Sequence, residues 1–145
     1  MPGIVVGVDG SGHSRKALER AAAEAVAHHA PLTVLVVHQA VRDVYGSPSH
    51  YPEDASQTEK ARESAKTEAD QVLAGLSVRP ESVTVTAVHG LPAEVLIKAS
   101  ENADMLVVGR RGMGGFALLT VGSVTTQLTH HAHCPVLLIP SPDEG

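Results

Sequence analysis

The stretch IVVGVDGSG, residues 4–12, joins a short apolar run to a glycine-rich turn. The β-branched residues at 4–8 predict a buried strand, which ends at Asp9. A second apolar run, LTVLVV, follows at 32–37. The segment between the two runs has apolar residues at helical spacing: Leu18, Ala21, Ala22, Ala25 and Val26. Strand, helix and strand in this order predict two parallel strands joined by a right-handed crossover.

The rest of the chain repeats this alternation. Strand patterns occur at 82–88, 104–108 and 135–139, and helical patterns at 56–76, 92–99 and 123–131. Residues 39–55 carry glycine, prolines and polar residues, which predicts a surface loop. Five strands interleaved with four helices, without a linker or an internal repeat, predict one α/β domain over 1–145. Its expected architecture is a doubly wound, Rossmann-like parallel sheet.

Composition excludes several classes of function. The chain has 145 residues, a formal net charge of −5, two Tyr, one Phe and no Trp. A nucleic-acid surface needs a basic patch or aromatic platforms, so we expect no nucleic-acid partner. No apolar run is long enough for a membrane span, and no secretion signal begins the sequence. With Cys134 as the single cysteine, these features predict a cytoplasmic protein without an internal disulfide.

A second glycine-rich loop, GRRGMGGFALLTVGS at 109–123, follows the predicted strand at 104–108. Gly109 and Gly112 permit a turn with positive φ, in which successive N–H groups form a concave anion site. Arg110 and Arg111 add positive charge beside it. In open α/β sheets, ligands bind beyond the carboxyl ends of the strands. This loop and the turn at Asp9 both follow strands, so both are candidates for ligand binding.

The end of the same loop offers a second anion site. Gly122 leads into a helix that Ser123 is expected to cap, which leaves the N–H groups of Val124 and Thr125 free. Two neighbouring anion sites suit a polyphosphate. Glycine turns and Gly-Ser caps are also common without any ligand, so the glycines alone favour both interpretations about equally. The usual nucleotide motifs, G-x-x-x-x-G-K-[ST] and G-x-G-x-x-G after the first strand, are absent.

The spacing Gly109-x2-Gly112-x9-Gly122-Ser123 resembles the signature of the ATP-binding branch of the universal stress protein family. The resemblance extends to IVVGVDGS at the start, to VHGLPAEVLIKASENADMLVVGRRG at 88–112 and to GSVTTQLTHHAHCPVLLIP at 122–140. It covers nearly the whole chain and is poorest at 39–55. It implies a five-stranded sheet of order 3-2-1-4-5, similar to the adenine nucleotide alpha hydrolase-like fold. In that order strands one and four are neighbours, so their loops share one ligand.

The resemblance also implies a role for each matching position. Asp9 would face the ribose or help to hold a phosphate-bound Mg²⁺, with Val8 near the base. Val37, at the end of strand two, would meet the adenine through its backbone, with Val108 packed nearby. The remaining positions would surround the ribose and the phosphates: Gly109, Arg111 and Gly112 on the α-phosphate side, and Gly122, Ser123, Val124 and Thr125 at the β- and γ-phosphates.

The expected function is therefore that of an ATP-binding stress-response regulator. Phosphoryl transfer needs an aligned nucleophile, a metal and usually a base. No residue of the sequence is a convincing base, so we expect slow hydrolysis at most and assign no catalytic residue. The alternatives are a cyclic-nucleotide (cAMP)-binding member, a weak ATPase or autophosphorylating protein, and an interaction protein that has lost its ligand. The downstream protein partner cannot be named.

Two further features lie near the end of the chain. The HHAHC segment at 130–134 offers metal ligands, but adjacent side chains on a helix point about 100° apart, so we expect no metal site there. The strand at 135–139 is apolar on both faces and is predicted at a sheet edge. The family resemblance implies that it pairs with the same strand of a second subunit to form a homodimer. The alternative is that the tail at 140–145 covers this edge.

Overall fold

The computed structural model describes residues 3–9, 14–39, 55–109 and 117–140. Strands and helices alternate along the chain, as the sequence predicts. Their bounds, in chain order, are β1 Ile4–Val8, α1 Arg15–Ala27, β2 Leu32–Gln39, α2 Ala55–Ala74, β3 Val83–Gly90, α3 Pro92–Ser100, β4 Met105–Gly109, α4 Ala117–His131 and β5 Val136–Ile139. None of the helices in these ranges is long and apolar enough to cross a membrane.

The five strands form one parallel sheet of order β3-β2-β1-β4-β5, which confirms the predicted fold class and topology. β1 lies at the centre, because Gly7 pairs with Leu35 of β2 on one side and with Val108 of β4 on the other. The strand order therefore reverses between β1 and β4. β5 lies at an edge beside β4, as expected.

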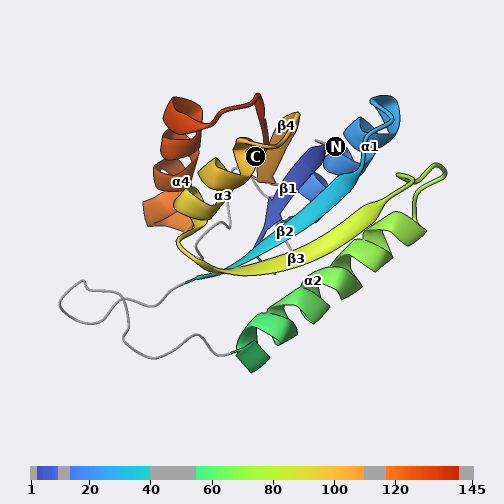
Figure 1. The fold of residues 1–145 in the computed structure, drawn as a ribbon, viewed down its shortest axis with the longest axis horizontal. Helices are drawn as coiled ribbons and strands as arrows, with labels where there is room; N and C mark the ends of the chain where they lie inside the picture. Colours follow the sequence, from blue (N-terminus) through green and yellow to red (C-terminus); the bar gives the residue numbers. More distant parts are fainter. Residues whose placement is uncertain (1–2, 10–13, 40–54, 110–116, 141–145) are drawn as a thin grey trace.

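Helices cover both faces of the sheet and create two hydrophobic cores (Figure 1). α1 and α2 pack on the face that carries Ile4, Val6 and Val34. α3 and α4 pack on the opposite face, where Leu106 and Val108 are buried. Because aromatic residues are nearly absent, valine, leucine and alanine fill most of both hydrophobic cores.

Gly7 lets α3 approach the middle of the sheet closely. A Cβ atom on Gly7 would lie 2.8 Å from Cδ2 of Leu96 and 3.3 Å from Cγ1 of Val108. Leu96 is completely buried and occupies the space that the glycine leaves. The absence of a side chain at Gly7 therefore allows α3 to pack closely on β1.

The C-terminus of α1 ends in a Schellman motif. The N–H of Ala30 donates to the carbonyl of Ala25 at 2.9 Å, and that of His29 donates to the carbonyl of Val26 at 3.2 Å. His29 adopts a φ of 51°, the left-handed conformation that this motif requires and that glycine usually supplies. A side chain with a Cβ is strained there.

Replacing His29 with glycine is expected to raise the free energy of unfolding by about 0.5–1 kcal/mol, because glycine adopts this φ without strain. The matched control is His28→Gly. His28 has a φ of −96° and lies 3.3 Å from the carboxylate of Glu24, so glycine there should lower stability. Urea denaturation of both variants measures the difference. Equal effects at the two positions would contradict the role given to the left-handed conformation.

Candidate functional site

The carboxyl ends of β1 and β4 lie side by side where the strand order reverses. The two strands pair directly, up to Gly7 and Val108. Asp9 follows the last residue of β1, and Gly109 is the last residue of β4. The starts of the two candidate loops are therefore neighbours at the place where open α/β sheets bind ligands.

Asp9 is held by Ser14, the residue that precedes α1. The Ser14 hydroxyl donates to Oδ1 of Asp9 at 3.2 Å and accepts the N–H of Asp9 at 3.4 Å. Ser14 is 5% exposed, although it stands at the N-cap of α1, where its side chain makes no capping bond. The serine thus holds the carboxylate of Asp9 at the edge of the sheet.

The three valines of the predicted site are buried. Val8 belongs to the core under α1 and α2, and Val108 to the core under α3 and α4. Val37 is 7% exposed and is not the end of its strand, because β2 continues to Gln39. The predicted strand end was therefore two residues too early. Since β1 ends where Val8 pairs with Val36, the backbone of β2 beyond Val36 has no partner strand on the β1 side among the described residues.

The start of α4 differs from the expectation. The helix begins at Ala117, six residues before Ser123, so the prediction that Ser123 caps it is wrong for this structure. Amides in the second turn of a helix bond to the carbonyls four residues earlier. The N–H groups of Val124 and Thr125 are therefore within the helical ladder, and Val124 also packs against the core under α3. The apolar run FALLTV extends the helix backward to Ala117 and outweighs the glycine at 122.

Two of the predicted ligand positions, Arg111 and Gly112, lie outside the described residues. Gly122 and Ser123 are described as part of the α4 backbone. Along the chain, Gly109 and the start of α4 at Ala117 flank this loop. The structure therefore brings Asp9 and Gly109 together, and it leaves the closure of the remaining loop around a ligand as a prediction.

Two histidines that the sequence analysis did not single out lie at the same edge of the sheet. His38 of β2 and His89 of β3 pair in register, and their rings meet edge to face with centroids 5.2 Å apart. By alternation they follow Val34 and Val36 on the α1–α2 face. Nδ1 of His38 is buried and has no hydrogen-bond partner in the described structure. In the sequence, one histidine directly follows the strand pattern at 32–37 and the other directly follows the pattern at 82–88. This placement could have identified them as candidates.

Glu68 of α2 is the second buried polar group near this edge. Its Oε1 atom has no hydrogen-bond partner among the residues described. Burial raises the pKa of Glu68, the positive charge of Arg15 lowers it in part, and the carboxylate of Asp9 raises it further. Arg15 itself donates to Oε1 of Gln71 at 3.1 Å. The negative charge of Asp9, at the end of β1, therefore acts on Glu68 of α2.

Comparison with known proteins identifies the family. Residues 2–140 match the Universal stress protein family, which is nearly the whole chain. The chain belongs to this family. A universal stress protein of Thermus aquaticus is 35% identical over 146 residues, with 94% of this chain and 96% of the relative covered. The chain spans about half the length of the mycobacterial universal stress proteins that it also matches.

Solved universal stress proteins share the fold. A crystal structure of a universal stress protein in complex with cAMP matches with a TM-score of 0.67 and 24% identity, covering 97% of each chain. A universal stress protein from Archaeoglobus fulgidus in complex with dAMP matches with a TM-score of 0.58 and 22% identity, covering 96% of this chain and 97% of that one. At these identities the likeness concerns the fold.

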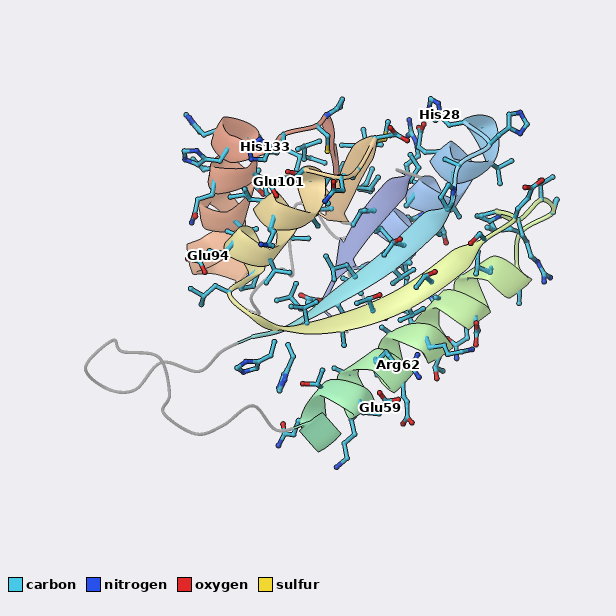
Figure 2. All side chains as sticks on the ribbon, viewed as in Figure 1. His28, Glu59, Arg62, Glu94, Glu101 and His133 are labelled. Atoms are coloured by element: carbon cyan, nitrogen blue, oxygen red, sulfur yellow. The ribbon has the colours of Figure 1, made fainter. Side chains whose placement is uncertain are left out.

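The histidine-rich segment at 130–134 begins within the last turn of α4. Among the described residues of this universal stress protein, no three His, Cys, Asp or Glu side chains are grouped closely enough to hold a metal ion. His133 lies beside Glu101 instead, with 3.9 Å between Nε2 and Oε1 (Figure 2). Burial raises the pKa of the Cys134 thiol, whereas a metal-binding cysteine needs the thiolate.

Glu68→Gln is expected to stabilise this stress protein at neutral pH by up to about 1 kcal/mol, because a desolvated carboxylate becomes a neutral amide. The raised pKa means that folded Glu68 holds a proton more tightly than the unfolded chain does. Ionised Glu68 therefore lowers stability as the pH rises above its ordinary value of 4.5. Denaturation at pH 4 and pH 7.5 should show a gain only at the higher pH. Glu63→Gln, at an exposed position of the same helix, is the control.

Proposed function

We propose that this universal stress protein binds ATP at the carboxyl edge of its sheet and acts as a nucleotide-dependent regulator. The observation that carries the proposal is the pairing of β1 with β4, which brings Asp9 and Gly109 to one point of strand-order reversal. The spacing from Gly109 to Ser123 supplies the matching glycine pattern. In this proposal Asp9 faces the ribose or helps to hold a phosphate-bound Mg²⁺, and the β2 backbone at Val37 faces the adenine.

Phosphate binding in this proposal requires a shorter α4. The amides of Ser123, Val124 and Thr125 can receive a phosphate only when they are not bonded within the helix. We infer that α4 begins at Ala117 without ligand and at Ser123 with ATP bound. Carbon-13 chemical shifts of residues 117–122 should lose their helical values on addition of ATP. Helical values that persist at saturation would contradict this inference.

A magnesium ion in this proposal arrives with the nucleotide. Mg²⁺ keeps several waters and takes few protein ligands when phosphates bind it. Asp9 is the one protein ligand that we assign, because its carboxylate is already oriented by Ser14. The ion would neutralise phosphate charge there. We assign no base for the attacking water, so slow hydrolysis at most is expected. Sustained phosphate release that is lost in Asp9→Asn would instead support an ATPase.

A nucleoside monophosphate is the rival ligand. The solved neighbours named above are complexes with cAMP and dAMP, each of which carries one phosphate. The glycine spacing favours a triphosphate, because it offers anion sites at both ends of the loop. Mass spectrometry of the co-purified ligand, followed by calorimetric titration with ATP, AMP and cAMP, distinguishes them. Tighter binding of cAMP than of ATP would overturn the proposal.

His38 is expected to border the base in this proposal. It follows Val37 on the part of β2 that extends past β1, and its Nδ1 atom is buried without a partner in the described structure. His38→Phe keeps the ring and removes the nitrogen, so ATP affinity should fall about 3- to 10-fold, the value of one hydrogen bond. His89→Phe, which keeps the ring contact, should change affinity less. Titration calorimetry measures both, and equal losses would refute the assignment.

We also propose that two copies of the chain pair through residues 135–139. Within the described residues β5 (Val136–Ile139) has a neighbouring strand, β4, on one side only, and its residues are half-buried on both faces. An edge strand of this kind is normally protected. Light scattering during size-exclusion chromatography should give the mass of a dimer. A monomer mass at micromolar concentration would favour coverage of the edge by the tail at 140–145.

A further inference from the structure

An apolar groove lies at the opposite end of the sheet from the proposed nucleotide site. It is lined by the end of α1 and by the connection from α2 to β3. Both segments lie beside the amino ends of β2 and β3 (Figure 1). The groove consists of two adjoining hollows of about 570 and 300 Å³, and Val26 and Val78 line both. We call it the amino-edge groove. All of its lining residues belong to the described part of the chain.

The groove exposes apolar surface. Val78 is 63% exposed and is the one large hydrophobic side chain that is so exposed in the described ranges. Ala23, Ala27 and Leu76 continue the apolar wall of the smaller hollow. A volume of about 570 Å³ lies within the range of small-molecule sites, roughly 300–1,000 Å³. Exposed apolar surface gathered in a hollow of this size suits an apolar ligand.

The rim of the groove offers hydrogen-bond donors. Arg79 and His29 line the larger hollow, and the side chain of neither makes a hydrogen bond or an ion pair within the described structure. The carbonyls of Ala25 and Val26 at the end of α1 accept the N–H groups of the Schellman motif. The guanidinium of Arg79 is the permanently charged donor that the rim offers to an anion.

We propose that the amino-edge groove binds a small amphipathic anion, with its apolar body along Val26 and Val78 and its charged group at Arg79. A medium-chain fatty carboxylate has this chemistry. Glu81 also lines the rim and opposes the anion, so it limits the affinity. The groove and the nucleotide site lie at opposite ends of the strands, so the two ligands bind independently.

The test uses decanoate below its micellar concentration, with calorimetry and nitrogen-15 NMR on the whole chain. We expect saturable binding that shifts the amides of 25–31 and 76–82. Affinity should rise about 15-fold from octanoate to decanoate, since each of the two added methylenes contributes about a factor of four. Prior saturation with ATP should leave decanoate affinity unchanged. Because this readout needs no nucleotide, it is independent of the proposed function.

Two substitutions, one that removes a positive charge from the rim and one that removes a negative charge, form a matched pair. Arg79→Gln should weaken decanoate binding about tenfold, and Glu81→Gln should strengthen it several-fold. Val78→Asp should abolish binding and, at an exposed position, leave the fold intact. Lys98→Gln, at an exposed position of α3 on the other face, should have no effect.

Three results would overturn the proposal. Decanoate could shift amides at the carboxyl edge instead, or decanol could bind as tightly as decanoate. The groove amides could also shift with protein concentration alone, which would assign the groove to contacts between copies of the chain.

Discussion

Replacing Leu96 with alanine is expected to lower the free energy of unfolding by about 4 kcal/mol. Leu96 has no exposed surface, and its Cδ2 atom lies over Gly7, where a Cβ would approach it to 2.8 Å. The cavity left by the substitution cannot be filled from the sheet, because Gly7 has no side chain to move into it. The loss should therefore fall in the upper part of the range for such substitutions. Urea denaturation measures it.

The controls separate a cavity from a general loss of apolar surface. Leu96→Met conserves volume and should cost less than about 1.5 kcal/mol. Val78→Ala should change stability by no more than about 0.5 kcal/mol, since Val78 is 63% exposed. A loss below about 1 kcal/mol in Leu96→Ala would show that α3 adjusts its position and that the glycine contact is loose.

Most of the fold was predictable because its strands are apolar and short. The run at 4–8 has the bounds of β1, and Pro92 begins α3, as its fixed φ and missing N–H lead one to expect. The strand order came from the resemblance to the universal stress protein family, and the sheet confirms it. Hydrophobic periodicity is a local signal, so it located the elements and could not have ordered them.

The errors fall where tertiary context replaces local signals. β2 extends two residues past Val37 because His38 and Gln39 pair with His89 and Gly90 of β3, although their side chains are polar. Ser123 resembled a helix cap, yet the apolar residues before it join the helix. His38 and Glu68 escaped notice because burial without a partner depends on elements distant in sequence.

Gly122→Trp is expected to weaken ATP binding at least 100-fold. In the proposed site the phosphates approach the backbone at Gly122, and an indole side chain would occupy that space. The free-energy cost is about 2.7 kcal/mol or more, which is the value of a 100-fold change. Tryptophan has a higher helix propensity than glycine, and Gly122 lies within α4, so the ligand-free fold should persist. Calorimetric titration measures the affinity, and thermal unfolding checks the fold.

Two further variants make this result specific. Gly75→Trp places the same side chain at the end of α2, where a Cβ meets only the Val72 carbonyl at 3.6 Å, so ATP affinity should stay within about twofold. Gly122→Ala adds one methyl group and strengthens a helix by about 1 kcal/mol, so it should weaken ATP binding about fivefold if binding shortens α4. Full affinity in a folded Gly122→Trp protein would move the phosphates away from α4. Full affinity in Gly122→Ala, with weak binding in Gly122→Trp, would keep the phosphates there and reject the shortening of the helix.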